Sequence, residues 1–501
     1  MLVAASFLVA SPLATRAEAQ TRTEAPRGED LPVVEHVLEN GMRFLVLRRA
    51  GAPTVSFVVR FEVGSVHESL GWTGAAHLLE HMLFKGTTTI GTRSVAGERV
   101  YFARMDAVHD SILAERARLG SADSARLAAL EARLRALGDT ARAFVISNEY
   151  DRILTRNGAR DLNAMTDSEA TTYYVQLPAN RTKLWFVLEA DRMRNPVFRE
   201  FYAERDVVAE ERRMRIDSDP GGQLYEAFLA TAFRVHPYGV PVIGHMSDIQ
   251  SFDRDQIEEY YRRYYGPNNA VVAVVGDVVP DSIIAWAESY FGPIPRGEVP
   301  RPVLAEEPPQ RGERRVEVEF DAEPRLLIGW HVPSVYDDDA PALSMLASIL
   351  TGGRTSRLYR RLVLEEKVAQ SVAAWIGPGQ RFPRLFMIEA TPTAGHTTAE
   401  LERAIYEEIE RLRESPPAPD EMRRIRNQLE AGEVRRLKGN FGLALQLVES
   451  VALYGDWRET FRTLDRFLAV EPEDVSRVAA RYLTRGNRTV ATLVRPGEGT
   501  E

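Results

Sequence analysis

Apolar residues in the first part of the chain follow the period of β-strands. Asn40-Gly41 separates two short runs, 36–39 and 42–47, and this dipeptide is typical of a tight turn between antiparallel strands. The apolar run from Val55 to Val63 predicts a further strand. The chain is therefore expected to open with strands of a β-sheet.

The second half of the chain shows a similar mixture of patterns. Strands are predicted at 315–320 and 325–331. Thr397 followed by Glu400 forms a capping box, which predicts a helix from this point to about Glu414. These strands and helices together predict the α+β class.

Two stretches of the chain repeat with altered sequence, which indicates an internal duplication. Residues 255–276 resemble 473–494, with Tyr264 matching Tyr482, so the offset in numbering is 482 − 264 = 218. Residues 82–86 resemble 349–353, where the offset is 353 − 86 = 267. The difference between the two offsets is 267 − 218 = 49, so the first copy is expected to contain an insertion of that length.

The segment 101–150 is the expected insertion. It is rich in Ala, Arg, Leu and Glu, and one helical face carries four leucines, which are Leu127, Leu130, Leu134 and Leu137. Gly120-Ser121 is the expected turn of a helical hairpin. The hairpin is interpreted either as a solvated arm or as a docking or gating arm, and the sequence leaves both open.

The duplication and a proline-rich stretch define the expected domain organisation. We predict an N-terminal domain at 32–290, a linker at 291–312 and a homologous C-terminal domain at 313–498. Each domain is expected to be an α/β sandwich. Ser344, Ala347 and Ser348 align with His77, Glu80 and His81, the candidate metal-binding motif of the first copy described below. The second domain is therefore expected to be inactive.

Two histidines and a glutamate form the most informative motif of the chain. His77 and His81 lie four residues apart, so on a helix they share one face, and Glu80 lies beside them. This is a zinc-hydrolase arrangement, in which Glu80 can reach a water molecule. The alternative is a polar surface helix that binds nothing. Apolar neighbours such as Leu78 and Leu79 favour a buried helix, where His and Glu need partners.

Composition restricts the remaining candidate ligands. The chain has no cysteine, so a zinc site must use His, Asp or Glu. Glu204 and Glu211 are seven residues apart, close to two helical turns, and share a face that Glu210 does not. The alternative is an ordinary charged helix. The formal charge of −9 and the lack of a basic stripe argue against a nucleic-acid partner.

The N-terminus predicts export. An apolar stretch at 2–14 precedes Ala17-Glu18-Ala19, a small-x-small cleavage pattern, so residues 1–19 are expected to be a signal peptide. No later segment of about 18 apolar residues predicts an integral membrane span. The mature protein is expected to be exported and periplasmic.

Several motifs resemble the pitrilysin and insulin-degrading enzyme family, the zinc peptidases with an inverted HxxEH motif. They are Gly64-Ser65-Val66-His67-Glu68, Gly74 to Thr87, Asn163-Ala164-Met165-Thr166, Glu204 to Arg213, His236-Pro237-Tyr238-Gly239 and Tyr265-Gly266-Pro267-Asn268-Asn269. The resemblance covers nearly the whole mature chain. It implies one zinc ion held by His77, His81 and Glu211, with Glu80 as catalytic base and Glu204 as a supporting carboxylate. We interpret His67 and His236 as structural.

The resemblance also implies how a substrate binds. In the family the Asn-Ala-x-Thr segment is a sheet edge, so Asn163 and Ala164 are expected to bind an extended peptide as an added strand. The alternative is an ordinary turn-to-strand transition. A closed chamber of this type implies short or unfolded peptides, and the reaction implied is zinc metalloendopeptidase activity.

The chain departs from the family pattern in its second half. Related enzymes form a clamshell of two halves, and this chain supplies one half, so dimerisation is expected. The half facing the zinc contributes an Arg and a Tyr seven residues later, and Val363 and Gln370 occupy these positions here. A heterodimer with a sister subunit that lacks the zinc motif but carries the Arg/Tyr pair is therefore expected over a homodimer. The alternative function is a noncatalytic zinc-binding or scaffold subunit.

Overall fold

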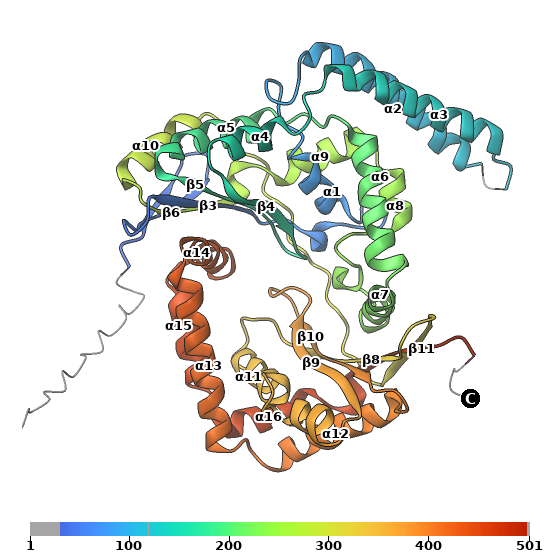
Figure 1. Ribbon diagram of the computed structural model, residues 1–501, viewed down its shortest axis with the longest axis vertical. Coiled ribbons are helices and arrows are strands. Elements are labelled where there is room, and N and C mark those ends of the chain that lie inside the picture. The colour runs from blue at the N-terminus through green and yellow to red at the C-terminus, as the bar shows by residue number, and fades with distance from the viewer. Residues whose placement is uncertain (1–30, 119, 498–501) are drawn as a thin grey trace, which may run out of the picture.

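The computed structural model describes residues 31–118 and 120–497, so the predicted signal peptide lies outside the described residues. Two α/β domains lie one above the other (Figure 1). The first has strands β1 Val34–Val37, β2 Arg43–Arg48, β3 Thr54–Phe61, β4 Arg160–Thr166, β5 Thr171–Pro178 and β6 Ala270–Gly276. The second has β7 Arg314–Glu319, β8 Arg325–Val332, β9 Ala369–Gly377, β10 Arg384–Pro392 and β11 Arg488–Val494.

Helices cover both sheets. In the first domain they are α1 Ala75–Met82, α2 Val95–Arg116, α3 Ser124–Ala141, α4 Glu149–Arg156, α5 Thr182–Arg194, α6 Phe201–Arg212, α7 Pro220–Ala232, α8 Met246–Ser251, α9 Arg254–Tyr264 and α10 Pro280–Tyr290. In the second they are α11 Ala340–Thr351, α12 Thr398–Glu414, α13 Pro419–Lys438, α14 Asn440–Tyr454, α15 Glu459–Leu468 and α16 Pro472–Tyr482. The α+β class is confirmed.

The two sheets share one topology, as expected for a duplicated fold. The first sheet has the order β1-β2-β6-β3-β5-β4 and the second the order β7-β11-β8-β10-β9. β2 pairs with β6 in parallel and β7 pairs with β11 in parallel, whereas the other neighbours in each sheet are antiparallel. Without β1, the first sheet therefore repeats in the second, strand for strand.

One asparagine contact is also repeated in both domains. The Asn269 side chain donates to the carbonyls of Tyr264, at 2.8 Å, and Glu62, at 3.3 Å. The Asn487 side chain donates to the carbonyl of Tyr482, at 2.8 Å, and to a strand carbonyl, that of His331, at 2.8 Å. Both amides join the end of a helix to a neighbouring strand, so the alignment of 255–276 with 473–494 is reproduced by contacts.

Each domain contributes a helix to the sheet of the other. Apolar side chains of α7, including Phe228 and Leu229, form one core with Leu327 and Met387 of the second sheet. Those of α14 form a core with the first sheet, where Leu447 lies in one cluster with strand residues of β2, β3 and β6. Figure 1 shows α14 beneath the first sheet and α7 over the second. The exchange buries both sheet faces, so each domain stabilises the other.

The predicted local elements are largely present. The strands expected at 315–320 and 325–331 are β7 and β8, and the predicted helix is α12, whose N-cap Thr397 accepts a hydrogen bond from the Glu400 amide at 3.2 Å. The strand predicted at 36–39 is displaced, since β1 spans Val34–Val37. The Asn40 side-chain amide donates to the carbonyls of Phe291 and Ile294, and its Oδ1 accepts a hydrogen bond from the Met42 amide, which holds the turn.

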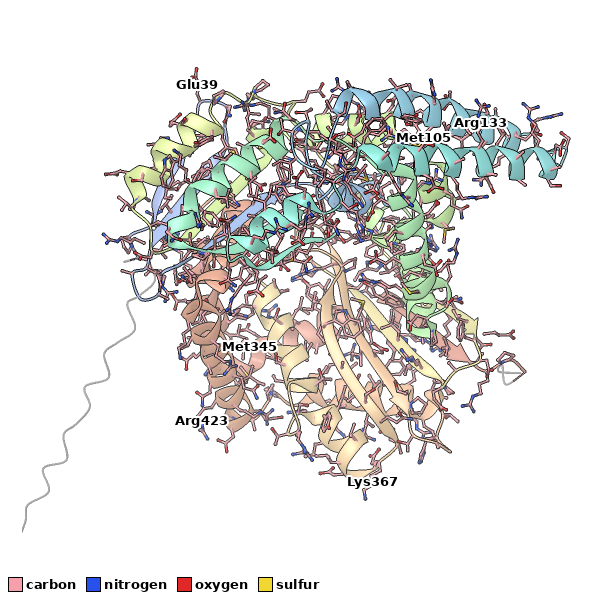
Figure 2. All side chains as sticks on the ribbon, turned by 45° about the horizontal axis from the view of Figure 1, so that its top comes forward. Glu39, Met105, Arg133, Met345, Lys367 and Arg423 are labelled. Atoms are coloured by element: carbon pink, nitrogen blue, oxygen red, sulfur yellow. The ribbon has the colours of Figure 1, made fainter. Side chains whose placement is uncertain are left out.

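The predicted insertion is a helical hairpin formed by α2 and α3. Phe102, Met105 and Ile112 on α2 are buried in the core of the first domain, whereas Arg133 is exposed. Figure 2 shows Met105 near the body of the molecule and Arg133 farther out along the arm. Of the predicted leucine stripe, Leu134 is buried and the other three are partly buried. The base of the arm is therefore part of the core, and its outer part projects.

No helix or strand lies between α10 and β7, where the linker was predicted. None of the described helices combines the length and the apolar character needed to span a bilayer.

Candidate metal and catalytic site

Helix α1 begins at a backbone position that only glycine fits. Gly74 has φ of +92°, and a Cβ atom there would lie 2.5 Å from the carbonyl oxygen of Ile243. The Glu68 carboxylate accepts hydrogen bonds from the amides of Gly74, at 2.8 Å, and Ala76, at 2.7 Å. These contacts satisfy amides of the first turn and fix the orientation of the helix.

The two faces of α1 have different roles. Leu78, Leu79 and Met82 are fully buried in the core of the first domain. His77 and His81 lie on the other face, where their side chains retain 12% and 23% of their exposure. Their ring centroids are 4.8 Å apart. The core side of the helix thus holds both imidazoles in place at a partly accessible surface.

Helix α6 brings a carboxylate to the two imidazoles. Nε2 of His81 lies 3.5 Å from Glu211 Oε2, and Nε2 of His77 lies 3.8 Å from Glu211 Oε1. One ligand atom from each of the three residues lies within 4.8 Å of the others. Two imidazoles and a carboxylate are a ligand set that catalytic zinc takes, with a position left for water or substrate. The donor set therefore fits a zinc ion.

The protonation of His77 suits a ligand. Burial, together with the nearby His81 and Arg215, lowers the pKa of His77 to about 3. Its Nδ1 atom is buried and has no hydrogen-bond partner among the described residues. A neutral imidazole that turns Nε2 toward a carboxylate is the form that binds a metal ion.

Glu204 holds the second imidazole. Its carboxylate lies 2.9 Å from Nδ1 of His81 and 2.5 Å from Nζ of Lys85. Burial would raise the pKa of Glu204, but the hydrogen bonds from His81 and Lys85 lower it to about 2. A carboxylate at Nδ1 places the proton there and leaves Nε2 facing Glu211, which is how a neighbouring carboxylate orients a metal-binding histidine. Glu210 points elsewhere and pairs with Arg213.

Glu80 lies on α1, and its side chain faces the edge strand β4 of the first sheet. Its carboxylate accepts a hydrogen bond of 2.5 Å from the hydroxyl of Thr166, the last residue of β4. Burial raises the pKa of Glu80, and the Thr166 hydrogen bond lowers it in part. A carboxylate of raised pKa, held by one hydrogen bond beside two imidazoles, is suited to accept a proton.

Asn163 and Ala164 belong to β4, which is the edge strand of the first sheet. The Asn163 side chain is exposed, and its Oδ1 accepts a hydrogen bond of 2.9 Å from the Ala164 amide. β4 pairs with β5 on one side, with a register shift between Arg160 and Asn163. An edge strand offers unpaired backbone groups to an added strand.

Two further histidines have structural contacts. His67 Nδ1 accepts a hydrogen bond from the Gly64 amide at 3.3 Å, and His236 Nδ1 accepts one from the Tyr238 amide at 3.2 Å. Neither belongs to the group of His77, His81 and Glu211.

The positions aligned with the Arg/Tyr pair lie in the second domain. Val363 is partly buried and packs against the core of that domain. Gln370, on the edge strand β9, donates to the carbonyl of Pro392 at 3.1 Å. Neither side chain carries the charge or phenol that the family pattern has at these positions.

The sequence did not identify three residues that contact the site. Thr166 and Lys85 lie within the family-like segments, and their spacing from Glu80 and Glu204 carries no signal of contact. Arg215 follows α6 in a π-helical turn and pairs with Glu211 at 2.9 Å. Arg215 lies four residues after Glu211, so the helical period could have indicated this contact.

The duplicated α/β fold, with His77, His81 and Glu211 grouped in its first copy, agrees with the family that the motifs resemble. The model of the insulinase family (peptidase family M16) matches residues 43–98 and 143–245, and that of the peptidase M16 inactive domain matches 251–429. The chain belongs to this family. The match omits 99–142, which includes most of α2 and α3.

A curated relative agrees with this membership, and solved structures share the fold. The chain is 26% identical over 472 residues to the zinc protease PqqE of Helicobacter pylori, covering 92% of this chain and 93% of that protein. A crystal structure of a protease from Helicobacter pylori superposes with a TM-score of 0.78 at 24% identity, over 93% of this chain and 100% of that one. The periplasmic protease PqqL from Escherichia coli gives a TM-score of 0.68 at 16% identity, over 92% of this chain and 47% of that one.

Proposed function

We propose that this protein is a zinc metalloendopeptidase that hydrolyses short or unfolded peptides. The observation that carries the proposal is the convergence of His77, His81 and Glu211 within 4.8 Å, with Glu80 beside the two histidines on the same helix. Its relative PqqE is named a zinc protease, which supports the same reaction.

His77, His81 and Glu211 would hold the ion, and Glu204 would keep His81 in the ligating tautomer. Zinc, when bound, supplies Lewis acidity toward a peptide carbonyl and lowers the pKa of a water molecule toward about 7. Glu80 accepts the proton of that water and then passes it to the leaving amine. Thr166 holds the Glu80 carboxylate during both transfers.

The substrate would bind as a strand added to β4. The amide of Ala164 donates to its neighbouring side chain, Asn163 Oδ1, so it is a donor that a peptide carbonyl can take over. β4 ends at Thr166, which contacts Glu80. A peptide paired with this edge would therefore pass the catalytic carboxylate, and recognition through backbone groups would read little of its sequence.

We propose that a second subunit completes the site. This chain corresponds to 47% of the length of PqqL, so a single chain supplies about half of that protein. Val363 has no side-chain hydrogen-bond donor, and the uncharged Gln370 amide donates to the carbonyl of Pro392. Together they would stabilise a developing oxyanion less than an Arg/Tyr pair, and loss of one such donor typically costs about a hundredfold or more in rate. A heterodimer with a sister subunit that carries the pair fits these facts better than a homodimer.

The same substitutions favour a second candidate, a noncatalytic zinc-binding or scaffold subunit. A complete ligand set beside Glu80 favours the peptidase. We also propose that the protein is exported to the periplasm, as its signal-like N-terminus and the periplasmic PqqL suggest.

Hydrolysis of a quenched peptide library by the purified mature chain, loaded with zinc, tests the proposal. The variant Glu80→Gln is the control for contaminating protease. Activity of the chain alone that vanishes in Glu80→Gln supports the peptidase and overturns the required heterodimer. Activity only in the presence of the sister subunit supports both the peptidase and the heterodimer. Zinc binding without hydrolysis in either assembly favours the scaffold.

A further inference from the structure

The second domain contains a cavity at the place that corresponds to the zinc site of the first. Ser344 and Ala347 of α11 align with His77 and Glu80, and both line this cavity. Leu429 of α13 also lines it and matches Glu211 by the same offset in numbering that relates Asn269 to Asn487. Duplication thus left a cavity where the metal chemistry was replaced by small and apolar side chains. We call it the second-domain cavity.

The second-domain cavity has the size of a ligand site. Its volume is about 750 Å³, within the range of small-molecule sites. Helices α11 and α13 to α16 and strands β9 and β10 contribute to its wall. Figure 1 shows α11, α13, α15 and α16 in the lower part of the molecule, with α14 above them beneath the first sheet. Apolar side chains such as Leu453, Leu464 and Phe467 line part of it. The rest of the lining is charged or polar and includes the carboxylates Asp337, Asp338, Glu433, Glu449 and Asp474. The apolar part suits the apolar chain of a ligand that also carries a polar group.

Arg384 is the unusual member of the lining. It is the first residue of β10 and retains 7% of its exposure, so its guanidinium is largely removed from water. Nη1 donates to the carbonyl of Gly379 at 3.1 Å, and Nε has no hydrogen-bond partner among the described residues. Burial lowers the pKa of Arg384, and the nearby Tyr238, Glu169 and Tyr454 offset this effect only in part.

The other arginines of the lining all have carboxylate partners. Arg436 pairs with Glu433, Arg466 with Glu459, and Arg477 with Asp339. Within residues 31–118 and 120–497, no carboxylate forms an ion pair with Arg384. The nearby Glu169 carboxylate instead accepts hydrogen bonds from the Tyr238 hydroxyl and from the amides of Gln380 and Arg381. A buried charge is costly unless it is paired, so Arg384 has donors free for a directly bonded negative group.

We propose that the second-domain cavity binds a small ligand that carries a carboxylate on an apolar chain, with the carboxylate on Arg384 and the chain against the apolar wall. A planar guanidinium binds a carboxylate through parallel hydrogen bonds. The C-terminal residue of a hydrophobic peptide and a fatty acid share this chemistry. The site lies in the inactive domain and does not depend on hydrolysis at the first.

Calorimetric titration of the full mature chain tests the proposal. The protein is the Glu80→Gln variant treated with chelator, so that peptides are not cleaved and no zinc competes for their carboxylates. The probes are acetyl-Leu-Leu with a free carboxylate, the same peptide as its amide, and decanoate. We expect the free acid to bind about tenfold or more tightly than the amide, because one hydrogen-bonded charge pair is lost. Tighter binding of acetyl-Leu-Leu would identify a peptide C-terminus as the ligand, and tighter binding of decanoate would identify a fatty acid.

Two added substitutions locate the site. Arg384→Gln is expected to weaken binding about tenfold or more, whereas Arg436→Gln, which removes a paired arginine of the same wall, is expected to change it less than about threefold. If Arg384→Gln does not fold, Ala347→Phe fills the cavity and is expected to abolish binding in a chain with the wild-type circular dichroism spectrum. The proposal is overturned if neither the free acid nor decanoate binds at about 10 mM, a concentration near the weak end of specific affinities. It is also overturned if binding is unchanged in Arg384→Gln or in Ala347→Phe.

Discussion

The hydroxyl of Thr166 donates a hydrogen bond of 2.5 Å to the carboxylate of Glu80. This contact joins the edge strand of the first sheet to the helix that carries both histidines. The group proposed to move protons is therefore positioned by the strand proposed to bind the peptide.

Replacement of Thr166 tests this link. Thr166→Val keeps the shape of the side chain and removes the hydroxyl, so Glu80 loses its hydrogen bond. We expect kcat/KM to fall about tenfold or more, the effect of one hydrogen bond to a charged group, with zinc content unchanged. Peptide hydrolysis is measured in the assembly that is active, and Thr166→Ser should retain most of the rate. Wild-type activity in the valine variant would show that Glu80 needs no such support.

Glu204 should control the affinity for zinc. Glu204→Gln weakens the carboxylate contact to His81 Nδ1, and loss of such a partner typically lowers metal affinity about 10- to 100-fold. The matched control is Glu210→Gln on the same helix, whose partner is Arg213. Competition with a fluorescent chelator measures both. Equal zinc affinity in the two variants would show that Glu204 does not contribute to zinc binding.

The base of the arm should matter for stability. Phe102 is buried and lies under the Arg254 guanidinium, with 4.1 Å from Cζ to the ring centroid. Phe102→Ala is expected to lower the free energy of unfolding by about 3–5 kcal/mol. Val100→Ala, on the exposed side of α2, should change it by less than about 0.5 kcal/mol. Urea unfolding followed by circular dichroism decides, and a small effect of Phe102→Ala would mean that the arm docks loosely.

His236 should make the protein less stable in mild acid. Burial lowers the pKa of His236 from 6.5 to about 4, so the imidazole is neutral in the folded protein. As the pH falls through 6.5, His236 takes up a proton in the unfolded chain before it does so in the folded protein. The contribution of the neutral His236 to the free energy of unfolding is therefore lost between pH 6.5 and about 4. The loss at pH 5 is about 2 kcal/mol.

His236→Asn is the matched variant, because asparagine can accept the same hydrogen bond from the Tyr238 amide and does not titrate. Urea unfolding at pH 7 and pH 5 should therefore show a smaller loss of stability in the variant than in the wild type. An identical loss in both would mean that other groups cause the acid sensitivity.

Local patterns predicted the parts of this protein whose causes are local. The capping box of Thr397 and Glu400 opens α12 because its contacts lie within four residues. His77, Glu80 and His81 share a helix face for the same reason. The domain boundaries remain predictions, and so do the roles of the site residues.

Contacts between distant segments needed the tertiary structure. Spacing put Glu204 and Glu211 on one face of α6, but only packing of α6 against α1 brings them to His81. Thr166 reaches Glu80 because β4 ends beside α1, and Lys85, in the bend after α1, reaches Glu204 on α6. The periodicity of one segment does not indicate where a distant segment will pack against it.

The sequence by itself determined the class, the duplication and the motif, since these are recorded in short-range patterns and in the repeat. The exchange of α7 and α14 between the domains was decided by the tertiary structure. So was the cavity, whose lining brings together Arg384 of β10 and Leu429 of α13. Both arise because apolar faces must be covered, and which segment covers a face depends on the packing of the whole chain.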